Sequence, residues 1–220
     1  MKTLNQQLLN FGYTQNFKDE DYYVSKSNFY PFKIINDWPR WEKNILNIYG
    51  EKFSGKTHLT DIFLKKFKGK KIKGNRFTND TLREFKIVEN LVIDDFDQNI
   101  DEVLIYSLFN IIDQDNKFLL INSNTPINEM NFKLNDLKSR TKNCLFAKIE
   151  KPDDDLMYAI LIKNFSDRQI VIEKKFIEFI IKRIDRSYEK IYEFIYKIDE
   201  ISLKKKKSID FKIIKEALKV

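Results

Sequence analysis

The sequence predicts an α/β fold, in which helices flank a parallel sheet and a small all-helical unit follows. A glycine-rich loop separates an apolar run at 45–49 from an amphipathic stretch at 58–67, as between a buried strand and a helix. Further apolar runs at 91–93 and 118–121 end in polar residues, as buried parallel strands do where their carboxyl ends meet. From about residue 151 the pattern becomes helical throughout.

Composition limits the class of protein. The 220 residues are 42% hydrophobic, which suffices for one core and a smaller second unit. Forty Lys and Arg residues against 33 Asp and Glu give a net charge of +7, which permits contact with nucleic acid or acidic surfaces. The single cysteine, Cys144, excludes an internal disulfide and favours a reducing compartment. No signal-type segment or long apolar span appears, so we expect a cytoplasmic protein without a membrane partner.

The glycine-rich loop matches the phosphate-binding pattern G-x-x-x-x-G-K-[ST]. A strand-loop-helix turn directs backbone N–H groups and the positive helix end toward phosphates. Lys56 would add charge and the Thr57 hydroxyl a magnesium ligand, whereas a chance glycine turn is the alternative. His58, next in the helix, is more often a packing residue than a catalyst. The predicted nucleotide-binding residues are Gly50, Glu51, Lys52, Phe53, Ser54, Gly55, Lys56, Thr57 and His58.

Two strand ends carry the other candidate residues. Leu91-Val92-Ile93 runs into Asp94 and Asp95, the Walker B pattern of a buried strand ending in acids. Asp94 would hold Mg²⁺, and Asp95 would orient the attacking water. Asp97 fits an ordinary turn. Asn124 follows the strand at 118–121, where it could sense a γ-phosphate, although Asn and Pro there also suit a simple turn.

The remaining expected elements follow from apolar spacing. The aromatic-rich stretch 29–41 could pack as a helix on the sheet edge or flank an adenine base. Asp153 or Asp154 could cap the first C-terminal helix. Lys204 to Lys207 would lie in a loop, as a solvated turn or a phosphate contact. Other helices are expected near 81–85, 102–115, 134–140, 154–164, 173–184, 188–203 and 210–219, and strands near 69–77 and 145–149.

In this order the motifs resemble the AAA+ module of the DnaA family. The likeness covers residues 22–220 and includes Lys56-Thr57-His58-Leu59, Ser27-Asn28, and Asp210-Phe211 with Ala217-Leu218. It implies an AAA+ nucleotide-binding core at 21–150 and a helical lid at 151–220. The chain ends at Val220, where a DnaA would continue into a DNA-binding helix-turn-helix.

Residues 1–20 resemble a different part of the family. Gln6, Leu9 and Phe11 are similar to the sliding-clamp-binding peptide of Hda-type proteins, although Gln7 departs from the usual Leu. From the residues alone, the segment could equally fray or begin a helix, or it could be a linear peptide for a hydrophobic pocket. Trp38-Pro39-Arg40-Trp41 resembles the alphaproteobacterial branch of the Hda-type family.

The Hda-type resemblance implies a negative regulator of replication initiation, acting in regulatory inactivation of DnaA. Its partners would be DnaA and the DNA polymerase III sliding clamp (beta), with DNA reached indirectly through the clamp. Arg140, in Leu137-Lys138-Ser139-Arg140, would be the arginine finger that completes the active site of a neighbouring ATP-bound DnaA. On spacing alone, Arg140 could also be a surface arginine or a salt-bridge partner.

Two residues depart from the family pattern at positions that would affect how this chain binds and hydrolyses a nucleotide. Phe53 stands where the family has glycine, so we expect a strained positive φ and weaker binding. Glu189 aligns with the lid arginine called sensor 2, leaving Lys190 or Arg186 to approach a γ-phosphate. The resemblance therefore implies ADP or ATP with Mg²⁺ as an orienting ligand, and weak intrinsic ATPase activity at most.

Two other functions stay open. The chain could be a self-assembling ATPase of helicase-loader type, a homo-oligomer that uses Asp95 with Arg140 between like subunits. It could also bind DNA directly through the lysine-rich lid.

Overall fold

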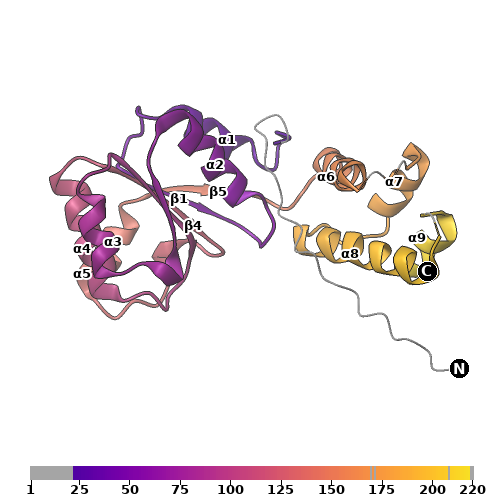
Figure 1. The fold of residues 1–220 in the computed structure, drawn as a ribbon. Helices are drawn as coiled ribbons and strands as arrows, with labels where there is room; N and C mark the ends of the chain where they lie inside the picture. Colours follow the sequence, from indigo (N-terminus) through magenta and orange to yellow (C-terminus); the bar gives the residue numbers. More distant parts are fainter. Residues whose placement is uncertain (1–21, 169, 171, 208, 219–220) are drawn as a thin grey trace, which may run out of the picture.

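The computed structural model describes residues 22–168, 170, 172–207 and 209–218. An α/β core lies on one side and four helices on the other, joined by the segment after β5 (Figure 1). The predicted fold class is confirmed. In the described part of the chain, no helix is long and apolar enough to cross a membrane. Gln6, Leu9 and Phe11 lie outside the described residues.

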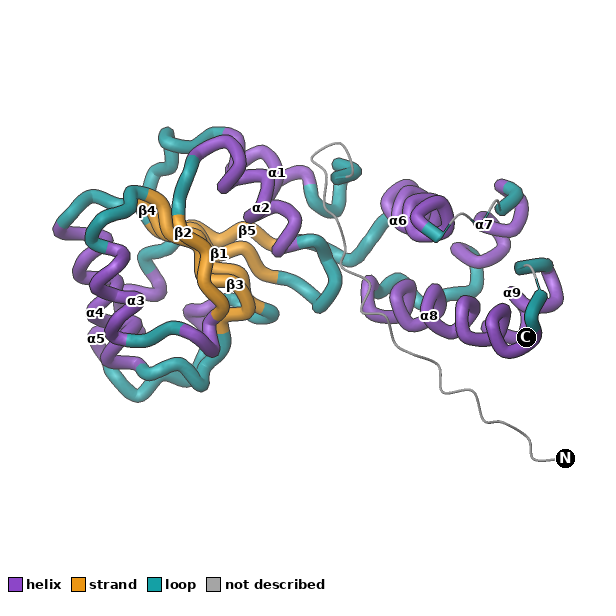
Figure 2. The backbone as a smooth tube through the Cα atoms, viewed as in Figure 1, coloured by secondary structure: helices purple, strands orange, loops and turns teal. Residues whose placement is uncertain are grey.

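The core contains a five-stranded parallel sheet with the order β2-β3-β4-β1-β5 (Figure 2). The central strands β3, β4 and β1 are buried, whereas β2 at one edge alternates between partly buried and exposed residues. The strands span Ile45–Tyr49 (β1), Lys70–Lys73 (β2), Asn90–Phe96 (β3), Phe118–Ser123 (β4) and Leu145–Lys148 (β5).

Helices cover both faces of the sheet. Leu46, Val92 and Leu120 point toward α1 and α2, whereas their neighbours Ile45, Leu91 and Leu119 point toward α3, α4 and α5. The helix after β1 therefore lies on one face and the helix after β4 on the other, which opens a crevice at the carboxyl ends of these adjacent strands. The helices span Phe29–Asn36 (α1), Lys56–Phe67 (α2), Asn79–Phe85 (α3), Glu102–Gln114 (α4) and Asn135–Lys142 (α5).

The C-terminal helices form their own apolar cluster. Ile191, Ile195 and Ile198 of α8 are buried in it, at the helical spacing that the sequence shows. Asp153 caps the first helix, where its side chain accepts a hydrogen bond from Leu156 N at 2.8 Å. The helices span Asp154–Asp167 (α6), Lys174–Ile181 (α7), Tyr188–Lys205 (α8) and Phe211–Leu218 (α9).

One expectation about the lid was wrong. The lysine run at 204–207 does not lie wholly in a loop, because Lys204 and Lys205 form the last turn of α8 and Lys206 is its C-cap. Lysines in the last turn interact favourably with the negative end of the helix dipole, and Lys204 also pairs with Glu200 four residues earlier.

Candidate functional site: a phosphate-binding loop facing a helical lid

The phosphate-binding loop connects β1 to α2, and both outer glycines of its motif are required by the backbone. A Cβ at Gly50 would lie 2.9 Å from the Ile149 carbonyl oxygen, closer than a side chain can approach. Gly55 caps α2 with a left-handed φ of +91°, and a Cβ there would meet the Tyr22 ring at 3.2 Å. These constraints argue against a chance match to the motif.

Phe53, in the same loop, adopts φ +64°, so the predicted positive φ is confirmed. This conformation costs a non-glycine residue about 1 kcal/mol. Its ring does not point into the core: it is 54% exposed and stacks on Tyr192 of α8, with centroids 4.3 Å apart and planes 2° apart. The strained residue therefore makes a contact between the loop and the lid.

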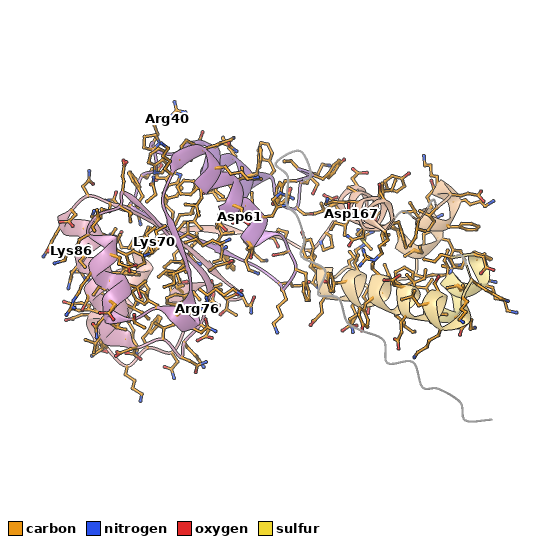
Figure 3. The ribbon with its side chains drawn as sticks, viewed as in Figure 1. Arg40, Asp61, Lys70, Arg76, Lys86 and Asp167 are labelled. Carbon is orange, nitrogen blue, oxygen red and sulfur yellow. The ribbon has the colours of Figure 1, made fainter. Side chains whose placement is uncertain are left out.

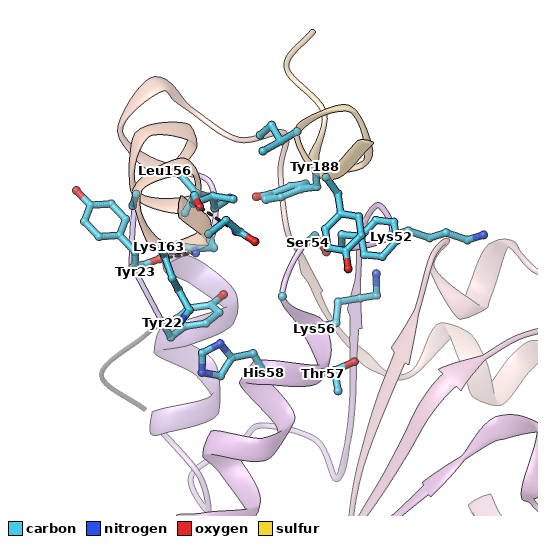
Figure 4. A pocket seen from close by; sticks show the side chains of 18 of the residues that line it. Tyr22, Tyr23, Lys52, Ser54, Lys56, Thr57, His58, Leu156, Lys163 and Tyr188 are labelled. Atoms are coloured by element: carbon cyan, nitrogen blue, oxygen red, sulfur yellow. Dashed lines mark hydrogen bonds between the residues drawn. The ribbon is translucent and has the colours of Figure 1, made fainter. Parts of the chain in front are cut away.

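Lys56 lies buried at the start of α2 (Figure 4). Its Nζ donates to the carbonyl oxygens of Gly50 and Glu51, both at 2.7 Å, and to Asn124 Oδ1 at 3.4 Å. Burial lowers the pKa of Lys56 from 10.5 to about 8, although the carboxylates of Asp94 and Asp95 oppose this shift. A buried cation within reach of the crevice is well placed to meet an anion.

Asp94 lies at the end of β3, only 3% exposed, next to the first turn of α2. Its Oδ1 accepts hydrogen bonds from Thr57 Oγ1 at 3.2 Å and from Asn122 Nδ2 at 2.9 Å. The two predicted magnesium ligands, Thr57 and Asp94, are therefore adjacent. Within the described residues no cluster of three or more His, Cys, Asp or Glu could hold a metal, so a cation here would need phosphate or water ligands too.

The two acids after Asp94 differ. Asp95 has a left-handed φ of +53° and its carboxylate lies 3.8 Å from Lys73 Nζ. Because its side chain is 69% exposed and lines the pocket, it can meet a water or a ligand. Asp97 accepts a hydrogen bond from Asn99 N at 2.7 Å, as a turn-forming residue does.

Asn124 reaches the loop from the tip of β4, as the sequence predicts. The buried Asn47 of β1 supports this tip: its Nδ2 donates to Ser123 Oγ at 2.9 Å, and its Oδ1 accepts from Ile127 N at 3.0 Å. Asn124, Lys56 and Asp95 all line one pocket, together with the rest of the loop from residue 52 to 58, whereas Gly50, Glu51 and Asp94 do not line it.

This pocket has a volume of about 470 Å³ and lies between the phosphate-binding loop and helices α6 and α8 (Figure 4). Away from the loop its wall is mostly apolar and aromatic, although Asn28, Lys163 and Asn164 also line it. Tyr22 packs edge-on against His58 with centroids 5.2 Å apart and stacks on Phe32, and Leu156 and Ile160 of α6 also line the pocket. A flat base attached to a phosphate chain would fit this shape.

Two buried polar atoms at the pocket are suited to bind a polar ligand. Ser54 Oγ and the Tyr22 hydroxyl are buried and have no hydrogen-bond partner among the described residues. Buried polar groups are rarely left unpaired, so such atoms mark a place where a ligand or water completes the bonding. Burial raises the pKa of Tyr22, which keeps its hydroxyl protonated. No sequence pattern assigned a role to Tyr22, because its pocket neighbour His58 lies far along the chain.

The lid wall differs from the expectation that Glu189 would occupy the sensor-2 position. Glu189 does not line the pocket; Tyr188, Ile191, Tyr192 and Ile195 of α8 do. The two nearby cations are engaged elsewhere, since Lys190 pairs with Glu193 and Arg186 with Asp154, both at 2.8 Å. The spacing 188, 191, 192, 195 is one face of a helix, and this periodicity could have identified the tyrosines.

Glu51 ties the loop to the lid. Its carboxylate accepts hydrogen bonds from Ser187 Oγ at 3.0 Å and from Tyr188 N at 3.1 Å, at the N-terminus of α8. An acid at this end of a helix satisfies a free N–H group and interacts favourably with the helix dipole. The phosphate-binding loop and α8 are thus connected by both Glu51 and Phe53.

Arg140 lies on α5 and does not line the pocket. Its Nη1 donates to Asp113 Oδ2 at 2.5 Å, and its guanidinium stacks over Tyr106, 5.3 Å from the ring centroid. The side chain is 34% exposed. The structure therefore separates Arg140 from the chain's own loop and gives it a salt bridge, one of the interpretations that the sequence left open.

Cys144 and His58 show no catalytic arrangement. Cys144 is buried in the core, where desolvation raises the pKa of its thiol to about 12. His58 is buried against Tyr22 at the edge of the pocket.

Known proteins resemble this chain in sequence and in fold. No family model matches the chain. The chain is 27% identical over 199 residues to the chromosomal replication initiator proteins DnaA of Caldanaerobacter subterraneus subsp. tengcongensis and of Thermoanaerobacter sp. (strain X514). Each match covers 80% of this chain but only 45% of the relative, so the chain spans less than half the length of these proteins.

Solved structures of DnaA and of other proteins have a similar fold. Domain III of the Thermotoga maritima replication initiation protein DnaA superposes with a TM-score of 0.73 at 21% identity, covering 94% of this chain and 97% of that one. AMPPCP-bound DnaA from Aquifex aeolicus has a TM-score of 0.66 at 18% identity, over 88% of this chain and 70% of its own. The Thermotoga maritima RuvB branch migration motor has 0.63 at 16%, over 80% and 61%.

The sheet order, the phosphate-binding loop and the helical lid together give the chain the fold of AAA+ P-loop proteins. The chain is similar in sequence to DnaA at 27% identity, and its fold is that of DnaA domain III.

Proposed function

We propose that the chain binds ADP or ATP with Mg²⁺ in the pocket between loop and lid. Lys56 and the loop N–H groups would hold the phosphates, Thr57 and Asp94 would hold the metal ion, and the Tyr22 end would hold the base. The main support is that Lys56, Thr57 and Asn124 line one pocket and that Asp94 bonds to Thr57 beside it, although these residues come from three segments of the chain. DnaA structures bound to AMPPCP among the structural neighbours also support this proposal.

Intrinsic hydrolysis is expected to be slow. The pocket face of α8 presents Tyr188 and Tyr192, which cannot neutralise the charge that develops on a transferred phosphoryl group. The nucleotide would then orient loop and lid.

The function we propose is that of a regulatory adaptor in replication initiation. Arg140 would complete the active site of an ATP-bound DnaA and stimulate its hydrolysis, while the segment carrying Gln6, Leu9 and Phe11 would dock on the DNA-loaded sliding clamp. Support comes from the position of Arg140, which is partly exposed, lies outside the chain's own pocket and is oriented by Asp113 and Tyr106. A guanidinium has five N–H donors, so the bond to Asp113 leaves others for a phosphate. The clamp contact rests on the sequence alone.

The test is γ-phosphate release from DnaA-ATP in the presence of DNA-loaded clamp and this protein. The wild type should accelerate release, and Arg140→Ala should abolish the acceleration, because arginine fingers contribute factors of about 10³ to 10⁵ in GTPases. Asp113→Ala is the matched control, since it breaks the same ion pair and keeps the guanidinium. Equal loss in both variants would assign Arg140 a structural role and contradict the finger.

A second pair of measurements separates the tether from the rival ATPase. The Gln6/Leu9/Phe11→Ala variant should lose stimulation with the clamp present. If the wild type leaves DnaA-ATP unaffected and instead assembles on itself with ATP and hydrolyses it, the self-assembling ATPase that pairs Asp95 with Arg140 replaces the adaptor.

A further inference from the structure

The net charge of the chain is concentrated in one short segment. Residues 65–76 contain Lys65, Lys66, Lys68, Lys70, Lys71, Lys73 and Arg76 and no acidic residue. Removing these seven from the 40 Lys and Arg residues leaves 33, which equals the number of Asp and Glu residues. The chain outside this segment is therefore neutral overall, and the charge of +7 belongs to the segment. We call residues 65–76 the basic edge.

The basic edge runs along one side of the sheet. It comprises the end of α2, the edge strand β2 and the 3₁₀ turn Gly74–Arg76, with Lys70 and Arg76 labelled in Figure 3. Lys70, Lys71 and Lys73 pair with Glu84, Asp61 and Asp95, respectively. Lys66 donates to the neutral amide of Asn36, and within the described residues Lys68 and Arg76 form no ion pair. An uncompensated positive charge thus remains at both ends of the edge strand.

Lysines on an edge strand also prevent pairing with the edge of another sheet. That role requires charges on β2 itself. Lys66 lies before β2 in the helix, and Arg76 lies after it in the turn, so protection of the edge does not explain them. Charge complementarity with an extended anion accounts for these two cations as well as for those on β2.

We propose that the basic edge is a docking surface for duplex DNA, which it contacts through the phosphate backbone without reading the sequence. Duplex DNA carries one negative charge per strand about every 3.4 Å, so a row of cations displaces counterions along it. Single-stranded DNA is held by aromatic platforms as well as charge. The one aromatic residue of the basic edge, Phe67, packs against Trp38 and does not offer such a platform.

The lysine run at 204–207 provides an internal comparison. Lys204 pairs with Glu200, and Lys205 pairs with Glu216, which leaves two lysines of that run unpaired in the described part of the chain, whereas the basic edge retains Lys66, Lys68 and Arg76. The lysine run lies on the helical unit, away from the sheet (Figure 1). The structure therefore favours the edge over the lid as the DNA contact.

The experiment measures fluorescence anisotropy of a labelled 25-base-pair duplex with the full chain across a series of KCl concentrations. The wild type should bind with a log K against log salt slope of about −3 to −5, since each phosphate contact contributes about −0.9. Lys66/Lys68/Arg76→Gln should reduce the magnitude of the slope by about 3 and weaken binding about 100-fold at low salt. Lys204/Lys206/Lys207→Gln, which removes as many charges from the lid, should bind within twofold of the wild type.

Each alternative outcome overturns the proposal. Absence of duplex binding, equal loss in the two variants, or tighter binding of the single strand of the same sequence would each contradict a duplex site on the basic edge. So would capture of polyglutamate with the affinity of the duplex, which would indicate an acidic protein partner. Thermal unfolding and ADP binding serve as folding controls, and both should match the wild type in both variants. Because the assay contains neither DnaA nor clamp, its result is independent of the adaptor proposal.

Discussion

The core and the lid form opposite walls of one pocket, and their chemistry differs. The core wall presents charged and polar groups at strand ends: Lys56, Thr57, Asp95 and Asn124. The lid wall presents mostly apolar and aromatic residues on helices: Leu156, Ile160, Tyr188, Ile191 and Tyr192. The core is therefore equipped to hold phosphates and a metal ion, whereas the lid is equipped to cover them and exclude water.

Because the two walls differ, binding of the phosphates and movement of the lid should be controlled by different residues. The tyrosines of α8 cannot detect a γ-phosphate by charge, and Lys163 of α6, which also lines the pocket, pairs with Asp167. The lid would therefore follow the nucleotide mainly through the loop. Two loop residues make that connection, Glu51 at the N-terminus of α8 and Phe53 on Tyr192. Affinity should depend on the core wall, and coupling of loop to lid should depend on these two contacts.

The largest effect should come from the core wall. Lys56→Met removes the buried cation, and charge-assisted hydrogen bonds to a phosphate are each worth about 1.5 to 3 kcal/mol. We expect the Kd for ADP to rise about 100-fold or more, measured by isothermal titration calorimetry. Lys52→Met is the control, because Lys52 lines the same pocket from the same loop. If Lys52→Met weakens binding as much as Lys56→Met, the loop acts through its total charge rather than through Lys56.

The next effect depends on pH. Because the pKa of Lys56 is lowered to about 8, the free protein loses this proton above that pH, whereas the phosphate complex needs it. The Kd for ADP should rise toward tenfold per pH unit above about 8.

Folding stability should change in the opposite direction. The unfolded chain keeps the Lys56 proton up to a higher pH than the folded chain, so the free energy of unfolding should increase between about pH 8 and 10.5, as the cost of the buried charge is relieved. The Lys56 ¹³Cε chemical shift should titrate near 8. A midpoint near 10.5 would contradict the shift.

The core wall could be predicted from the sequence, and the contacts between the loop and the lid could not. The loop motif is local, because its eight residues, Gly50 to Thr57, are contiguous in the sequence. Asp94 and Asn124 follow because parallel strands end at one edge of a sheet. The contacts of Glu51 with Ser187 and of Phe53 with Tyr192 join segments far apart in sequence, and they depend on how the lid is placed. Glu189 was chosen from the family resemblance. Successive residues on a helix point about 100° apart, so Tyr188 faces the pocket and Glu189 next to it does not.

The stack between Phe53 and Tyr192 should have an intermediate effect. An aromatic pair contributes about 0.5 to 1.5 kcal/mol beyond its buried area, so Tyr192→Ala should speed dissociation of a fluorescent ADP analogue by about 3- to 10-fold. Phe53→Gly loses the same stack but also removes the positive-φ strain, so its thermal stability should exceed that of Phe53→Ala. The double variant Phe53→Ala/Tyr192→Ala should be no faster than either single variant. Additive effects would show that the two rings act independently.

The smallest effect should come from Glu51→Gln. The amide oxygen can still accept from Tyr188 N, but the negative charge at the N-terminus of α8 is lost, which is worth about 0.3 to 1 kcal/mol. If loop and lid are coupled through this carboxylate, the Kd for ADP should rise about two- to fivefold. Glu189→Gln removes an equal charge from the same first turn of α8 without touching the loop, so it should lower helix stability alone and leave the Kd unchanged. Equal shifts in the two Kd values would mean that the lid responds to the charge at its helix end and that Glu51 transmits nothing from the nucleotide.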